Sequence, residues 1–174
     1  FSSRRRHTRY PLVTGVQTCA LPILAQGDLN HALDELFRRH GAPAKAELIR
    51  SLLLLWHDHL DASHVISQGI ENPDGSLVHG IMHRREPDYW NSKYWFRRVG
   101  QHACFTDLAR RVEPLLAADA KLAAQLLPRG AWDPFAFVDA VEAAAGKPTT
   151  DARHQLLRRV QQAEAEAALD YFLT

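Results

Sequence analysis

The sequence has few cysteines, no long apolar run and no large excess of either charge. Its 174 residues include two cysteines, one methionine and a formal net charge of +1 at pH 7. Two cysteines are too few for a disulfide framework or a cysteine-rich zinc site. No apolar segment reaches the roughly 20 residues that a membrane-spanning helix needs. These absences predict one domain with its own core, in a reducing, cytoplasmic compartment and with no membrane partner.

The first 23 residues differ in character from the rest of the chain. They contain four arginines and no acidic residue, a pattern typical of a basic arm or a targeting segment. Read as nucleic acid, however, they resemble a translated sequencing adapter. Adapter codons taken in order give SRRRHTR at residues 3–9 and VTGVQTCALPI at residues 13–23, with a barcode-sized gap between them. We interpret residues 1–23 as a non-native or disordered tail, and residues 24–174 as a domain whose natural N-terminus is missing.

Excluding residues 1–23 changes what the charge implies. Removing four arginines lowers the basic residues from 21 to 17 against 20 acidic ones, so the formal charge becomes −3. A net negative domain disfavours nucleic acid as a partner. Cys19 is also excluded, and the remaining Cys104 is more typical of a small buried hydrophobe than of a nucleophile. A signal peptide before the domain stays an open alternative.

The spacing of apolar residues predicts an all-α, bundle-like single domain of about six to seven helices. Turn and cap signals set the expected ends, as at Pro43, the ENPDG turn at residues 71–75, and Asp133-Pro134. The expected helices cover about residues 29–40, 44–69, 76–85, 90–99, a helix from 106 that Pro114 kinks or restarts, 133–145 and 149–172.

Histidines are concentrated in the middle of the chain, and two polar groups have helical spacing there. These groups are His57, Asp61 and His64, with Gln68 beyond them, and then His79, His83 and Glu86. Successive residues of a helix turn by about 100°, so each group would form one stripe. The expected turn at residues 71–75 separates the two helices. If these helices pack antiparallel, the two stripes face one another.

Imidazoles and carboxylates are the usual protein ligands of zinc, iron and manganese. Helical bundles build such sites from inward side chains, and Asp61-x-x-His64 resembles the Glu-x-x-His spacing of di-iron bundles. We therefore expect one transition-metal ion bound by residues from a set of five: His57, Asp61, His64, His79 and His83. Glu86 would be a further ligand or a general base, and Arg84 or Arg85 would anchor a substrate. The simpler alternative is that these histidines satisfy internal hydrogen bonds.

Residues 84–98 combine arginines with aromatic rings. Arginine binds carboxylate or phosphate through two parallel hydrogen bonds, and aromatic rings offer stacking faces. The candidate ligand-binding residues of this segment are Tyr89, Trp90, Lys93, Tyr94, Arg97 and Arg98. They indicate an alternative function as a non-catalytic module for a small anionic or aromatic ligand, or for a protein partner. Core packing of the rings and ion pairs with nearby acidic residues is the structural alternative.

The strings HDHLD and HRREPDYWNSKYWFRRVG resemble a family of bacterial and fungal proteins over about residues 52–108. The resemblance implies no activity, so it transfers no functional residue. Three hypotheses remain from the residues themselves: a metal-dependent enzyme, a non-catalytic binding module and a structural domain without a site. None of them predicts an oligomeric state.

Overall fold

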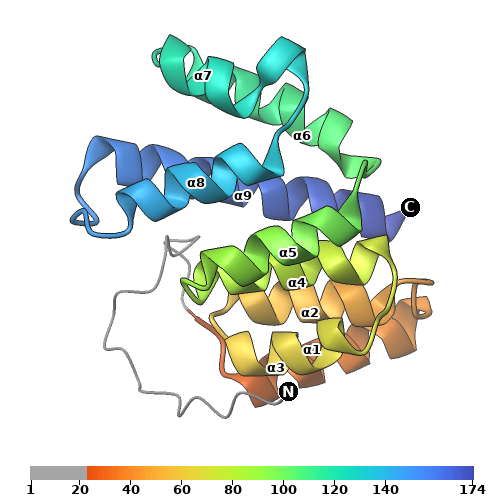
Figure 1. The fold of residues 1–174 in the computed structure, drawn as a ribbon. Coiled ribbons are helices and arrows are strands. Elements are labelled where there is room, and N and C mark those ends of the chain that lie inside the picture. Colours follow the sequence, from red (N-terminus) through yellow and green to blue (C-terminus); the bar gives the residue numbers. More distant parts are fainter. Residues whose placement is uncertain (1–22) are drawn as a thin grey trace.

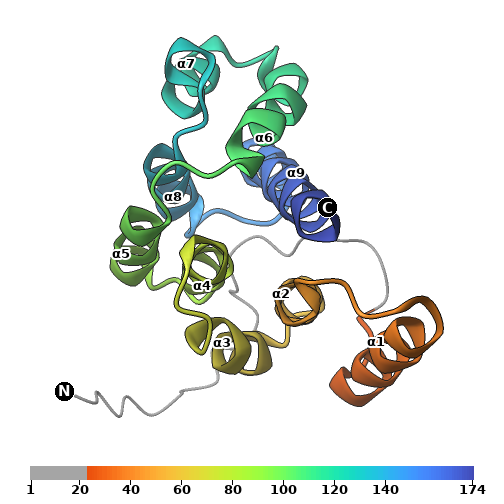
Figure 2. The same cartoon turned by 90° about the vertical axis from the view of Figure 1, so that its right-hand side faces the viewer.

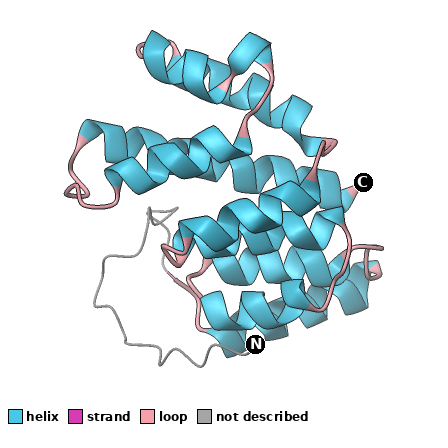
Figure 3. Cartoon of the chain, in the orientation of Figure 1, coloured by secondary structure: helices cyan, strands magenta, loops and turns pink. Residues whose placement is uncertain are grey.

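The computed structural model describes residues 23–174, which form an all-helical domain without strands (Figures 1 and 3). Nine α-helices lie in this range: α1 Gln26–His40, α2 Ala46–Trp56, α3 Leu60–Gln68, α4 Pro73–Arg85, α5 Tyr89–Val99, α6 Cys104–Val112, α7 Ala120–Leu126, α8 Pro134–Ala144 and α9 Ala152–Leu173. Two short 3-10 helices cover Glu113–Leu116 and Pro128–Gly130. The all-α prediction is confirmed. The interpretation of residues 1–23 stays a prediction, because all but Ile23 lie outside the described residues.

The helix count exceeds the expected six to seven, chiefly because the helix predicted at residues 44–69 is two helices. The chain leaves helical geometry between α2 and α3, where Asp58 has a φ of 63°. A left-handed residue cannot continue a right-handed helix. The Asp58 carboxylate contacts the Arg85 guanidinium of α4, so a tertiary ion pair lies at the break. The predicted single stripe from His57 to Gln68 was therefore wrong in its assumption of one continuous helix.

The helices α6 and α7 lie at one end of the molecule, and α1 and α3 lie at the other (Figures 1 and 2). One hydrophobic core runs through α2, α4, α5, α6, α8 and α9, whereas α1 packs with Leu54 in a small separate cluster. Helix α4 is the most enclosed, since every residue from Gly75 to Arg85 is buried. Polar residues on α4 therefore lie inside the protein. No helix of the described range is long and apolar enough to cross a membrane.

The predicted turn at residues 71–75 belongs in part to α4, which begins at Pro73 rather than near Ser76. The Asn72 side chain accepts a hydrogen bond from the Gly75 amide at 2.9 Å, as an N-cap does. A Cβ on Gly75 would lie 2.1 Å from the Ile70 carbonyl oxygen, so only glycine permits this close turn. The turn brings α3 back against α4.

Helices α4 and α5 pack closely through a second glycine. A Cβ on Gly80 would lie 3.2 Å from ring carbons of Phe96, and the Ser92 hydroxyl donates to the Gly80 carbonyl at 2.7 Å. These two contacts hold α5 against α4, with the α5 face that carries Asn91 and Trp95 directed toward α4. Side chains of α3, α4 and α5 consequently meet around one space.

Candidate metal centre

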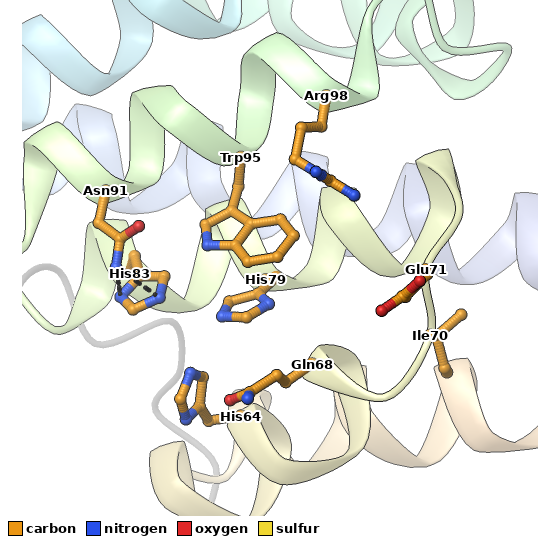
Figure 4. Close-up of a pocket in the computed structure, with 9 residues that line it drawn as sticks. All are labelled: His64, Gln68, Ile70, Glu71, His79, His83, Asn91, Trp95 and Arg98. Carbon is orange, nitrogen blue, oxygen red and sulfur yellow. Dashed lines mark hydrogen bonds between the residues drawn. The ribbon is translucent and has the colours of Figure 1, made fainter. Parts of the chain in front are cut away.

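Three histidines from two helices meet in the structure: His64 from α3, and His79 and His83 from α4 (Figure 4). One ring nitrogen of each lies within 4.8 Å of those of the other two. The rings of His79 and His83 are nearly parallel, with centroids 4.8 Å apart, as residues one helical turn apart can be. The His64 ring meets His79 edge-on at a centroid distance of 4.7 Å. We call these three residues the three-histidine cluster.

His79 is the most buried member of the cluster, with 1% of its surface exposed. Its ring stacks on Trp95 with centroids 3.8 Å apart. Within the described chain, neither of its ring nitrogens has a hydrogen-bond partner. Leaving a buried polar group without a partner costs roughly 1–3 kcal/mol. A bound ion that accepts the ring's lone pair would remove part of this cost.

The electrostatic surroundings keep His79 neutral. Burial, followed by the neighbouring rings of His83 and His64, lowers the pKa of His79 from 6.5 to about 3. The ring therefore carries a lone pair at neutral pH, which is the form that binds a metal.

His83 is oriented by two polar neighbours. Its Nδ1 lies 3.1 Å from Glu86 Oε2, and its Nε2 lies 3.0 Å from the side-chain nitrogen of Asn91. Because the carboxylate accepts, we assign the proton to Nδ1 and the lone pair to Nε2. A carboxylate behind a histidine is the usual support for a metal-binding imidazole. Glu86 thus lies behind His83 and is not among the residues that line the adjoining pocket.

The three-histidine cluster opens onto a pocket of about 510 Å³. The other lining residues are Gln68, Ile70 and Glu71, at the end of α3 and in the following turn, and Asn91, Trp95 and Arg98 on α5. In Figure 4, α5 forms one wall of the pocket and α3 the opposite wall, with His79 between them. A metal held by the cluster would therefore have access to small molecules.

The other two predicted ligands, His57 and Asp61, lie outside the cluster. His57 is the residue at which α2 ends, and its Nδ1 accepts a hydrogen bond from the Leu24 amide at 3.2 Å. Asp61 is exposed in the first turn of α3. The break at Asp58 changes the helical phase between α2 and α3. Of the predicted stripe, only His64 and Gln68 line the pocket.

The two predicted substrate anchors are buried in the core. Arg84 is wholly buried and pairs through both terminal nitrogens with the Glu164 carboxylate of α9. Arg85 donates to the Leu55 carbonyl and to Asp58. Burial lowers the pKa of Arg85 to about 10, against the opposing effect of Asp58. Neither arginine lines the pocket, and both connect α4 to neighbouring segments.

The aromatic part of the predicted ligand-binding segment divides between surface and core. Trp90 is 74% exposed and stacks on exposed Tyr94 at a centroid distance of 6.4 Å. Tyr89 is half-buried against the core, and burial raises the pKa of its hydroxyl.

The basic part of the segment divides in a similar way. Lys93 pairs with Asp139 of α8, and Arg97 is exposed outside the pocket. Arg98 is the one predicted residue of this segment that lines the pocket.

Five lining residues were not among the predicted ligands, catalytic residues or ligand-binding residues: Gln68, Ile70, Glu71, Asn91 and Trp95. Asn91, Trp95 and Arg98 are spaced as i, i+4 and i+7, so helical periodicity alone could have placed them on one face of α5. Glu71 lies in a turn, where no periodicity applies, and only the fold places it in the pocket.

No protein family, curated protein or solved structure matches this chain. The chemistry of the pocket therefore carries the functional argument.

Proposed function

We propose that the protein is a metal-dependent enzyme that holds one transition-metal ion at the three-histidine cluster. The observation that supports this most is His79, a buried neutral ring whose two nitrogens have no partner within the described residues. Three histidines are a ligand set of catalytic zinc, in which a fourth position is left for water or substrate. In this protein the fourth position would face the pocket. Zinc is the first ion to test, followed by iron and manganese.

The separations of the three nitrogens are compatible with metal loading after a small movement. Tetrahedral zinc with bonds of about 2.0–2.1 Å places two nitrogen ligands roughly 3.4 Å apart. The cluster nitrogens lie within 4.8 Å, so the widest pair must approach by at most about 1.4 Å. Metal loading would require the His64 and His83 rings to move by this amount. His79, held by its stack on Trp95, would be the fixed point.

The residues of the chain have distinct roles in this proposal. A bound metal would supply Lewis acidity and would lower the pKa of a coordinated water to near 7. Glu86 holds the proton on Nδ1 of His83 and so directs the other nitrogen toward the cluster. Gln68 and Asn91 offer side-chain amides to a substrate in the pocket. Arg84 and Arg85 support α4 from the core and do not touch the substrate.

Metal content is the primary test. The full chain, incubated with zinc and passed through gel filtration, should retain about one zinc per chain. His79→Ala should retain none, and His40→Ala, at the exposed end of α1, is the matched control that should retain all of it. A folded protein that takes up neither zinc, iron nor manganese would exclude the proposal.

Exchange at the fourth position separates a catalytic from a structural site. A cobalt-substituted protein should change its visible spectrum when azide is added, because azide replaces coordinated water. The metal-loaded protein should also hydrolyse activated esters or phosphate esters faster than His79→Ala does. A cobalt spectrum that azide leaves unaltered would mean a closed, structural site.

A second candidate function is a non-catalytic binding module, and the exposed stack of Trp90 and Tyr94 favours it. Exposed aromatic rings beside Arg97 offer stacking and charge to a partner. In this case, Trp90→Ala should abolish partner binding while the zinc content stays at the wild-type value.

A further inference from the structure

The pocket has a second end with a different chemistry. In Figure 4, His64 and His83 lie toward one end, and Arg98 and Glu71 lie toward the other. Arg98 comes from the last turn of α5 and Glu71 from the segment between α3 and α4. Trp95 and Gln68 lie between the two ends. A ligand that spans the pocket would therefore meet opposite charges at one end and the three-histidine cluster at the other.

Neither charged side chain at this end has an oppositely charged partner among the described residues. Within the described residues, Arg98 and Glu71 form no ion pair with each other or with any other side chain. The guanidinium carbon of Arg98 lies 5.2 Å from the centroid of the Trp95 ring. Arg38, Arg39 and Arg110 are also exposed, and each pairs with an acidic residue three or four positions away. Arg98 has Tyr94 and Trp95 at those positions instead.

Two opposite charges in one pocket restrict the ligand that fits. A guanidinium binds a carboxylate through two parallel hydrogen bonds. A ligand with only a negative charge would be attracted by Arg98 and repelled by Glu71. A ligand with only a positive charge would be attracted by Glu71 and repelled by Arg98. A ligand that carries both charges on adjacent atoms is attracted by both side chains.

We propose that this end of the pocket binds the head of a small zwitterionic molecule, namely an α-amino acid or a compound with the same adjacent carboxylate and ammonium groups. Arg98 pairs with the carboxylate, and Glu71 pairs with the ammonium. The body of the molecule lies along Trp95 and Ile70, and its reacting group reaches the three-histidine cluster. This inference rests on the proposed function, because it takes the metal as the reactive end of the same pocket.

Three compounds with one carbon skeleton test the inference: L-leucine, 4-methylpentanoate and isoamylamine. Binding to the full-length, zinc-loaded protein is followed through the indole N–H signal of Trp95 in two-dimensional NMR spectra. L-leucine should bind at least about tenfold more tightly than either singly charged compound. Arg98→Gln should weaken the binding of L-leucine and 4-methylpentanoate about tenfold but should not weaken that of isoamylamine, because the substitution removes a repulsion. Glu71→Gln should weaken the binding of L-leucine and isoamylamine but not that of 4-methylpentanoate. Arg159→Gln and Glu142→Gln, at exposed residues outside the pocket, are the matched controls.

Several results would overturn the inference. These are equal affinity for the three compounds, tighter binding of 4-methylpentanoate than of L-leucine, or affinities that neither pocket variant changes. No detectable binding of L-leucine or of the smaller L-alanine up to about 50 mM would overturn it as well. The zinc content of the same samples is measured in parallel. Zinc retained without zwitterion preference refutes this inference alone, whereas failure to take up zinc, iron and manganese refutes the proposed function whatever the amino acid does.

Discussion

Two buried histidines in different parts of this molecule, His102 and His79, differ in how their ring nitrogens are hydrogen-bonded. His102 is 7% exposed and uses both ring nitrogens: Nε2 lies 2.8 Å from Asp74 Oδ1, and Nδ1 lies 3.0 Å from Cys104 Sγ. Lys45 binds the other Asp74 oxygen at 3.2 Å. We call these four residues the His102 group. In the three-histidine cluster, by contrast, both ring nitrogens of His79, which is also buried, lack a partner within the described residues.

The comparison teaches that residue types alone do not identify a site. Cysteine, histidine and aspartate in hydrogen-bond contact are the components of a nucleophilic triad. However, burial above all, with the Glu164 and Asp74 charges, raises the pKa of the Cys104 thiol to about 12. The thiol is therefore protonated at neutral pH, and none of the His102 group lines the pocket. The His102 group connects the starts of α2, α4 and α6, whereas the ring nitrogens of His79 have no hydrogen-bond partner among the described residues and lie beside an open space.

The largest expected effect of this difference is on the free energy of unfolding of the metal-free protein as the pH is lowered. The unfolded state protonates His79 below about pH 6.5, while the folded state resists until about pH 3. The free energy of unfolding should therefore fall as pH falls through this window, by up to about 1.4 kcal/mol per pH unit from His79. Urea denaturation between about pH 7 and pH 4 measures it. His79→Leu should flatten the slope and His40→Leu should keep it; an equal slope in all three would contradict the lowered pKa.

Substitution by leucine should have different effects on the free energy of unfolding at His102 and at His79. His102→Leu leaves Asp74 and Cys104 without their shared partner, and we expect it to destabilise the fold by about 1–3 kcal/mol. His79→Leu removes a ring whose nitrogens have no partner among residues 23–174, so it should be neutral or stabilising by about 1 kcal/mol. Urea midpoints at neutral pH give both values. A large loss for His79→Leu without metal would show that its ring has a structural partner.

Glu86 tests the orientation of His83 with a smaller effect. Glu86→Gln removes the charge behind the ring but keeps its shape, so zinc affinity should fall about 10- to 100-fold. The stability of the metal-free protein should change by no more than about 0.5 kcal/mol, because the side chain is exposed. Competition with a chelating dye measures the affinity. Glu113→Gln, exposed in the 3-10 helix after α6, is the control; equal affinities in both variants would leave Glu86 without a role.

Much of the fold could be predicted because its signals are local. Asp133 and Pro134 start α8 as expected, and the apolar spacing predicts α9 within a few residues. The break between α2 and α3 could not be predicted, because the sequence there contains neither glycine nor proline. It occurs where Asp58 adopts a left-handed conformation in contact with Arg85, which is 27 residues away.

The same distinction applies to the candidate site. The i, i+4 spacing of His79 and His83 places both on one face of α4, and a turn after α3 predicts that His64 faces them. The pairing of Arg84 with Glu164 depends on a helix 80 residues later in the chain. The placement of Glu71 and Arg98 at the same end of the pocket also depends on how the helices pack. No local sequence pattern predicts that packing.

The smallest expected effects are those of His57→Ala and Asp61→Ala, the two predicted ligands outside the three-histidine cluster. Each should change zinc affinity by no more than about twofold and stability by no more than about 0.5 kcal/mol. His64→Ala, which removes a cluster ligand from the same helix as Asp61, is the comparison and should lose most of the affinity. Chelator competition measures all three variants. Equal losses for His57→Ala and His64→Ala would require α2 and α3 to join into one helix when metal binds, and the break at Asp58 would then belong to the metal-free protein alone.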